Sequence, residues 1–294
     1  MFFQKKEPEN NNIEGRVYDN AYIPKKLENI ILKHVIINSL KLPNYKPSPL
    51  LFLQGRKGEG KTFMTEKILE GNNISYKKIS SSILTGKKEG EAVDNLMLYY
   101  NKCEMNPNIK KYTALVIDDF HLSIAITKAT AGHTTNADNL IEALMNIADR
   151  KEELKAPIIL IGNDFTDAYP PLVRAGRASI CTWEPTIDDK KQIVKTMIRT
   201  HGEQTNNITD DSIYDFVDHY KNQYIGFFEK AIENVCFNNF EPVTDFFVDN
   251  SGDVTVDQLM DIAQRTINTN VISIERIAEE AENILKSNFK KLDD

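Results

Sequence analysis

Apolar positions recur along the chain in two patterns whose order predicts a parallel sheet covered by helices. Residues 23–40 carry apolar side chains at helical spacing, and three prolines within residues 42–49 end this pattern. Nearly continuous apolar runs, typical of strands buried on both faces of a parallel sheet, lie at residues 50–53, 112–120 and 156–164. A further short strand and two helices are predicted between them, at residues 74–80, 89–105 and 136–153.

The pattern changes at about Pro185, beyond which no segment has the spacing of a strand. Five amphipathic segments follow, and several begin at Thr or Ser with acidic residues in the first turn, as helices do. They lie at residues 186–200, 209–221, 226–240, 255–267 and 273–287. We therefore predict a flexible leader at residues 1–17, an α/β domain with helices on both faces of a parallel sheet at residues 18–185, and a small all-α domain at residues 186–294.

Composition narrows the class of protein. The 294 residues are 41% hydrophobic and 27% charged, which is ordinary for a globular protein, and no apolar run predicts a membrane span or a secretion signal. We expect a cytoplasmic protein without a membrane partner. A net charge of −7 disfavours nucleic acid as a partner, because a phosphate backbone attracts a basic surface. The three cysteines are predicted to be reduced thiols, and the histidine spacing predicts no transition-metal site.

A glycine-rich segment joins the first buried strand to the following helix. Residues 55–62, GRKGEGKT, fit the phosphate-binding pattern G-x-x-x-x-G-K-[ST], in which backbone N–H groups and the helix N-terminus surround a polyphosphate. Lys61 is predicted to contact the β- and γ-phosphates of ATP, and Thr62 to bind Mg²⁺. A chance match in a glycine turn is the alternative, which the flanking strand and helix disfavour. The predicted nucleotide contacts are Gly55, Arg56, Lys57, Gly58, Glu59, Gly60, Lys61, Thr62 and Phe63.

Two acidic residues end the second long apolar run. Asp118 and Asp119 fall at the carboxyl end of a predicted buried strand, where open α/β sheets bind ligands. Together with the glycine-rich segment they predict a second nucleotide-binding motif. Asp118 then holds Mg²⁺ through water, and Asp119 orients and deprotonates the attacking water. Alone, the two residues would equally suit a strand that ends at the solvent.

The next strand is followed by residues found in ring-forming ATPases of the AAA+ class. Asn163 lies where these proteins place a polar residue, called sensor 1, that contacts the γ-phosphate and the attacking water. Arg174 and Arg177, in LVRAGR, resemble the arginine fingers that AAA+ proteins direct at the nucleotide of a neighbouring subunit. The resemblance implies an oligomer that needs its neighbour for catalysis.

Three longer segments, NADNLIEALMNIAD, APIILIGNDFTDAYPPLVRAGR and TWEPTIDDK, resemble rubisco activase, an AAA+ remodelling ATPase. The resemblance spans roughly residues 18–284. It implies a P-loop αβα domain followed by an all-α lid, with ATP and Mg²⁺ as cofactors. It also implies that Tyr22 and Ile23 pass the adenine, and that residues 81–91 and 121–135 form two pore loops.

The chain departs from this family at several positions. The family's N-terminal linker corresponds to the segment around Tyr22 and Ile23. Only about twenty residues precede it, whereas plant members have a long region there. In the family, arginines of the lid called sensor 2 contact the γ-phosphate. The corresponding positions in this chain are Ile232 and Asn234, and Lys230, one turn earlier, is a weak substitute. The second pore loop offers Lys128 and His133 in place of the family's arginine and tyrosine. The catalytic acid, more often Glu, is Asp119, which predicts slow hydrolysis.

These features favour one function and leave two others open. The preferred prediction is a homo-oligomeric ring, with six subunits, that hydrolyses ATP and remodels a protein partner of unknown identity through its central pore. A nucleic-acid-handling AAA+ ATPase, such as a helicase loader or a clamp loader, shares the same motifs and is disfavoured by the acidic charge. A nucleotide-binding scaffold that does not hydrolyse ATP is the third reading.

Overall fold

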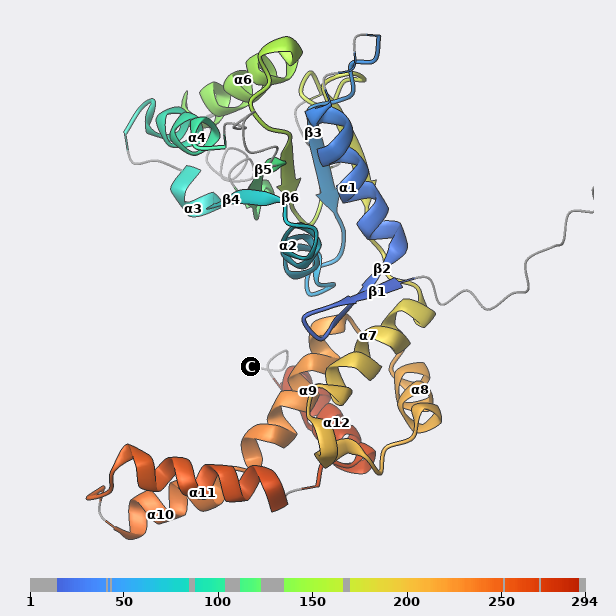
Figure 1. The fold of residues 1–294 in the computed structure, drawn as a ribbon, viewed down its shortest axis with the longest axis vertical. Coiled ribbons are helices and arrows are strands. Elements are labelled where there is room, and N and C mark those ends of the chain that lie inside the picture. The colour runs from blue at the N-terminus through green and yellow to red at the C-terminus, as the bar shows by residue number, and fades with distance from the viewer. Residues whose placement is uncertain are drawn as a thin grey trace, which may run out of the picture.

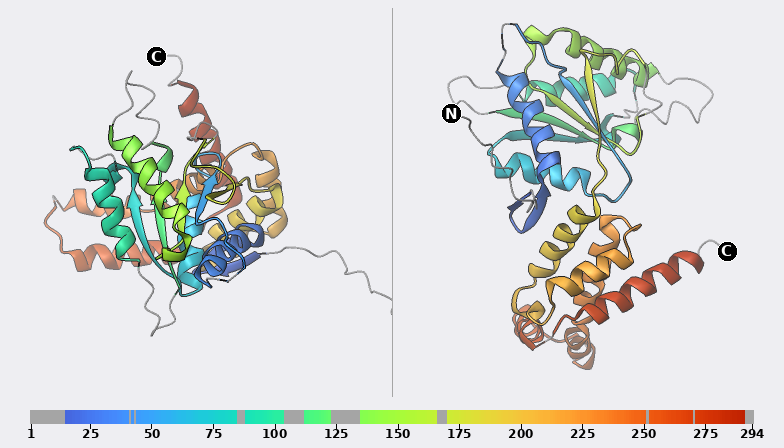
Figure 2. Two further views of the ribbon diagram at one scale, coloured as in Figure 1. Left: turned by 90° about the horizontal axis from the view of Figure 1, so that it is seen from above. Right: turned by 90° about the vertical axis from the view of Figure 1, so that its right-hand side faces the viewer.

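The computed structural model describes residues 15–40, 42, 44–84, 88–103, 112–122, 135–165, 170–250, 252–269 and 271–290. An upper α/β part and a lower helical part are visible in Figure 1, and Figure 2 shows the same two parts from two further directions. The upper part is built on a five-stranded sheet in which every pairing is parallel, in the order β4-β5-β6-β3-β7. Its strands are β3 (Leu50–Gln54), β4 (Ser75–Ser80), β5 (Thr113–Asp118), β6 (Ile158–Ile161) and β7 (Ala178–Thr182).

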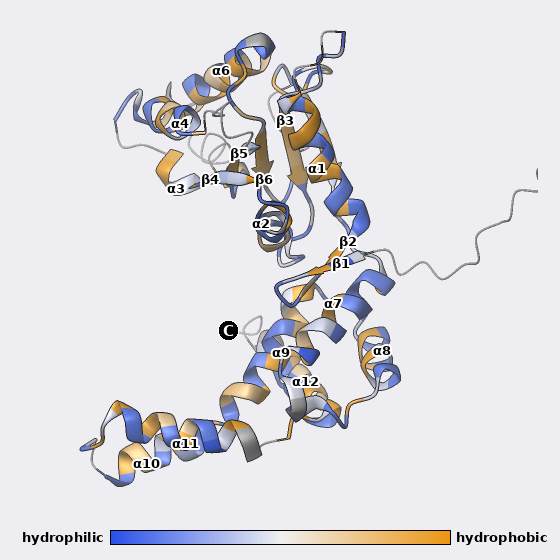
Figure 3. Ribbon diagram, viewed as in Figure 1, coloured by the Kyte–Doolittle hydropathy of each residue, from blue (hydrophilic) through white to orange (hydrophobic). Residues whose placement is uncertain are grey.

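Side-chain alternation along β3 explains why both faces of this sheet carry helices. Leu50 and Phe52 pack in one core with α4 (Glu91–Asn101) and α6 (Thr135–Asp149). Leu51 and Leu53 point to the opposite face, where they meet α1 (Lys25–Ser39) and α2 (Lys61–Gly71). A strand buried on both faces has no polar face, and Figure 3 shows β3 and β6 as mostly hydrophobic. The predicted αβα architecture is thus confirmed.

A small hairpin precedes the sheet. Its strands, β1 (Gly15–Tyr18) and β2 (Ala21–Pro24), pair antiparallel, with Val17 opposite Tyr22. The prediction of a leader at residues 1–17 is therefore wrong for residues 15–17, because these residues pair with β2. Residues 1–14 lie outside the described residues. The hairpin was missed because each strand has only four residues and no apolar alternation long enough to be recognised.

The lower part consists of helices, as predicted. A core formed by α7 (Ile187–Arg199), α8 (Asp210–His219), α9 (Ile225–Asn238) and α12 (Ile274–Lys290) encloses Phe227 and Phe228. Thr186 caps α7 through a reciprocal capping box with Asp189, and Thr209 caps α8. A hairpin of α10 (Glu241–Asp249), which was not predicted, and α11 (Val256–Thr269) extends to one side (Figure 1).

Short elements complete the described chain, namely α3 (Ser81–Leu84), η1 (Lys151–Glu153) and η2 (Gly202–Thr205). Among the helices that the structure describes, none combines the length and the apolar character needed to cross a lipid bilayer.

Candidate functional site

The loop between β3 and α2 has a backbone that only glycine adopts easily. Gly55, Gly58 and Gly60 all have positive φ angles, of 153°, 82° and 72°. At two of them space is lacking as well, since an added Cβ would lie 2.2 Å from the Trp183 carbonyl oxygen at Gly55 and 2.4 Å from the Tyr224 ring at Gly58. The glycines predicted from the phosphate-binding pattern thus occupy positions that require them.

Lys61 begins α2 and is almost enclosed by this loop. Its Nζ donates hydrogen bonds to the carbonyl oxygens of Gly55 at 2.7 Å and Arg56 at 3.0 Å, and lies 3.4 Å from Asn163 Oδ1. Burial lowers the pKa of Lys61, and nearby carboxylates oppose this shift. The ammonium group therefore sits among acceptors at the N-terminus of α2, where an anion would also be stabilised.

The two predicted metal ligands are in contact. Thr62 Oγ1 donates a hydrogen bond to Asp118 Oδ1 at 2.7 Å, although the residues lie on different elements. Asp119 follows in the left-handed region with φ of 52°, a conformation that persists only where the surroundings enforce it. Its side chain lines the same cavity as Lys61. A hydroxyl and a carboxylate side by side are ligands that Mg²⁺ prefers.

Asn163, the predicted sensor 1 residue, lies between Lys61 and a histidine. Its Oδ1 faces Lys61, and its Nδ2 is 3.2 Å from His121 Nε2. The Asn163 carbonyl oxygen also accepts from the Gly55 N–H at 3.1 Å. Because β6 lies beside both β3 and β5, its end brings Asn163 to the phosphate-binding loop.

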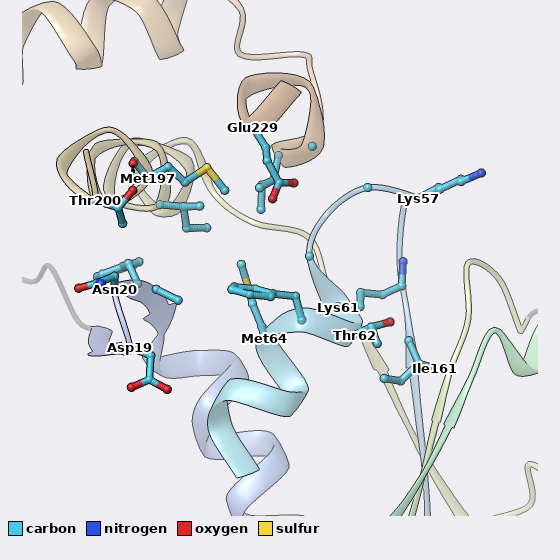
Figure 4. A pocket seen from close by; sticks show the side chains of 18 of the residues that line it. Asp19, Asn20, Lys57, Lys61, Thr62, Met64, Ile161, Met197, Thr200 and Glu229 are labelled. Atoms are coloured by element: carbon cyan, nitrogen blue, oxygen red, sulfur yellow. Dashed lines mark hydrogen bonds between the residues drawn. The ribbon is translucent and has the colours of Figure 1, made fainter. Parts of the chain in front are cut away.

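Lys61, Thr62, Asp119 and Asn163 line a cavity of about 640 Å³ between the two parts of the chain, a volume within the usual range for ligand pockets. Asp118 does not line this cavity itself but contacts Thr62, which does. Figure 4 shows Met197, Thr200 and Glu229 on the helical side of the cavity, across from Met64 on α2. Tyr22, predicted beside the adenine, also lines it. Residues from the helical part were not predicted to line the site, because no motif marks them. The one available signal was the spacing of Ile193, Met197 and Thr200, which places them on one face of α7.

Some predicted nucleotide contacts lie elsewhere. The cavity is lined by Lys57, Gly58, Gly60, Lys61, Thr62 and Phe63. By contrast, Gly55, Arg56 and Glu59 line a second hollow beside the segment around Trp183, and Ile23 is fully buried in the core. Arg56 Nη1 donates to the Asn222 carbonyl oxygen at 2.8 Å. Its side chain therefore faces the helical part and not the cavity.

The two predicted finger arginines differ in their surroundings. Arg177 Nε and Nη2 donate to the two carboxylate oxygens of Asp149, both at 2.6 Å, and Nη1 donates to the Pro171 carbonyl oxygen. Arg174 is exposed, and its guanidinium group makes no hydrogen bond or ion pair with any residue in the described ranges. Only Arg174 is thus available to another molecule without breaking a contact.

The sensor 2 positions do not face the cavity. Ile232 is buried in the helical core, and Asn234 Nδ2 donates to Glu280 Oε2 at 3.2 Å. Lys230 is exposed and does not line the cavity either. Of the predicted pore loops, residues 85–87 and 123–134, which include Lys128 and His133, lie outside the described residues.

Comparisons with known proteins point to one family. Residues 51–185 match the family described as "ATPase family associated with various cellular activities (AAA)". The chain is 30% identical over 230 residues, 74% of its length, to a chloroplastic rubisco activase of Larrea tridentata, covering 46% of that protein. It is also 30% identical to a chloroplastic rubisco activase of Vigna radiata, over 72% of the chain and 50% of that protein. The identity to a chloroplastic rubisco activase of Arabidopsis thaliana is likewise 30%, over 71% of the chain and 46% of that protein.

The chain spans about half the length of the curated relatives it matches. Within that span lie the parallel sheet, the glycine-rich loop and the paired aspartates, all of which the family match covers. The chain is therefore an AAA+ protein of the rubisco activase-like type.

Proposed function

We propose that this chain binds ATP with Mg²⁺ in the cavity between the start of α2 and the helical part of the chain, and that it hydrolyses the ATP there. The observation that supports this most is the 2.7 Å contact between Thr62 and Asp118, with Lys61 one residue away on the same loop. Bound Mg²⁺ would neutralise charge on the β- and γ-phosphates. Thr62 would hold the ion directly and Asp118 through water, while Lys61 would turn from the loop carbonyls to the phosphates.

Asp119 and Asn163 are proposed to act on the attacking water. Asp119 would accept its proton, and Asn163 would orient it together with the γ-phosphate. Asp119 is one methylene shorter than the more common Glu, so its carboxylate reaches less far into the cavity. Hydrolysis is therefore expected to be slow.

We further propose that the neighbouring subunit of a hexameric ring completes the site. The unengaged guanidinium group of Arg174 would stabilise charge that develops on the transferred phosphoryl group. Arg177, held by Asp149 in its own chain, would shape the segment that carries Arg174. The assignment of Arg177 as a second finger stays a prediction.

We propose a protein as the remodelled partner. The relatives are named as activases of ribulose bisphosphate carboxylase/oxygenase. The similarity of this chain to about half the length of these relatives supports a partner that is itself a protein. The net charge of −7 agrees with this choice over nucleic acid.

Release of phosphate from ATP tests the ATPase proposal. We expect turnover that requires Mg²⁺ and is lost in Lys61→Ala, while Lys33→Ala, an exposed lysine on α1, serves as the matched control and retains it. Equal turnover in Lys61→Ala and the wild-type chain would contradict the proposal. Absence of turnover with ATP still bound would favour the scaffold reading.

A further inference from the structure

A lysine of β4 contacts the carboxylate that is proposed to hold Mg²⁺. Lys78 Nζ lies 3.3 Å from Asp118 Oδ2 and 2.5 Å from Glu66 Oε1. The two oxygens of Asp118 are thus engaged separately, since Oδ1 accepts from Thr62 at 2.7 Å and from the Asp119 N–H at 3.1 Å. Only Oδ1 faces the metal position beside Thr62.

The fold brings these groups together on one face of the sheet. Lys78 pairs in parallel register with Val116, so both side chains leave the sheet on the side that α2 covers, as does Asp118 two residues later. On α2, Glu66 lies four residues after Thr62 and therefore on the same helix face. The lysine, the two carboxylates and the threonine form one cluster at the end of the phosphate-binding loop.

The charges in this cluster affect cation binding. The side chains of Glu66 and Asp118 are 26% and 18% exposed and that of Lys78 is 39% exposed, so water screens the cluster only in part. In the absence of Mg²⁺, the ammonium group neutralises Asp118. When Mg²⁺ binds beside Thr62, two cations lie on opposite sides of one carboxylate, and their repulsion weakens metal binding.

On the basis of the proposed function, we propose that Lys78 is a positioning residue of the metal site. It holds Asp118 with Oδ1 toward Thr62 and sets the Mg²⁺ concentration at which the nucleotide site is filled. Glu66 moderates this effect, because its carboxylate offsets the charge of Lys78. Nothing in the sequence pattern of the two nucleotide motifs includes this lysine.

The test is fluorescence titration of the ADP analogue mant-ADP at a series of Mg²⁺ concentrations, a measure of binding without turnover. We expect Lys78→Met to lower the half-saturating Mg²⁺ concentration by roughly three- to tenfold. Mant-ADP affinity in EDTA should stay the same. Lys78→Arg should keep the wild-type midpoint, and Glu66→Gln should raise it. Lys77→Met is the matched control, because Lys77 is the neighbouring exposed lysine and pairs with Leu115, on the other face of the sheet.

Several outcomes would overturn the inference. An unchanged Mg²⁺ midpoint in Lys78→Met would remove the role of Lys78 while leaving the nucleotide site intact. An equal shift in Lys77→Met would show a general charge effect. Absence of mant-ADP binding by the wild-type chain, or binding that is independent of Mg²⁺, would overturn the proposed function together with the inference.

Discussion

Lys190 Nζ lies 3.6 Å from Glu59 Oε1, and this ion pair joins the phosphate-binding loop to the helical part of the chain. Both residues are buried, with 6% and 4% of their surface exposed. Lys190 also donates to the Gln223 carbonyl oxygen at 2.5 Å, and Glu59 Oε2 accepts from the Ile225 N–H at 3.1 Å. The position of α9 beside the cavity therefore depends on a side chain of the loop that is proposed to surround the phosphates.

Removal of Glu59 is expected to destabilise the chain. In Glu59→Ala the ammonium group of Lys190 loses its counter-ion inside the protein, and breaking a buried pair typically lowers the free energy of unfolding by about 3 kcal/mol. Replacing both residues by methionine should restore most of the loss, since no unpaired charge remains. Chemical denaturation measures both variants. A loss below about 0.5 kcal/mol in Glu59→Ala, the range of ordinary surface changes, would contradict this account.

The pair formed by Arg177 and Asp149 is expected to be structural. Arg177→Ala and Asp149→Ala should each lower the free energy of unfolding by about 1 kcal/mol, because a bidentate but partly exposed pair is screened by water. The double variant should lose little more than either single variant. Arg174→Ala, whose side chain has no such partner, serves as the control and should leave stability unchanged. Fully additive losses in this double-mutant cycle would show that the two residues do not stabilise each other.

His34 is expected to make the fold sensitive to acid. Burial lowers the pKa of this α1 residue from 6.5 to about 4, so the unfolded chain binds a proton more readily than the folded chain between these values. The free energy of unfolding should therefore fall as the pH falls through this window, by about 2 kcal/mol between about pH 7 and pH 5. Urea denaturation at both pH values measures the difference.

In His34→Gln this part of the acid sensitivity should be absent, provided that the variant folds at neutral pH. The exposed His219 offers the matched control His219→Gln, which should keep the full pH dependence. The same pH dependence in His34→Gln and wild-type protein would assign the effect to other groups.

The sequence predicted the features of the site that depend on local spacing. A fixed interval links Gly55, Lys61 and Thr62, and the carboxyl ends of parallel strands bring Asp118 and Asn163 to the same edge of the sheet. Each of these positions can be inferred without knowing which segments pack together. The structure places all five around one loop.

What the sequence could not predict are pairings between distant segments. Glu59 with Lys190, Lys78 with Asp118, and Arg177 with Asp149 each join elements whose contact follows from the packing of the sheet and the helices. Short elements were missed for a different reason. The edge strand β7 has only five residues and an exposed Ile180, and α10 has no buried side chain among its described residues, so neither shows a clear periodic pattern.

The central claim is that a neighbouring subunit completes each ATPase site, and mixing two inactive variants tests it most directly. Asp119→Asn retains Arg174 and is expected to bind ATP without hydrolysing it, whereas Arg174→Ala retains Asp119. In a one-to-one mixture, random assembly of a ring pairs an intact Asp119 with a neighbour's Arg174 in about a quarter of the interfaces. We predict that phosphate release by the mixture recovers to about a quarter of the wild-type rate. A mixture that is no more active than either variant alone would contradict the claim.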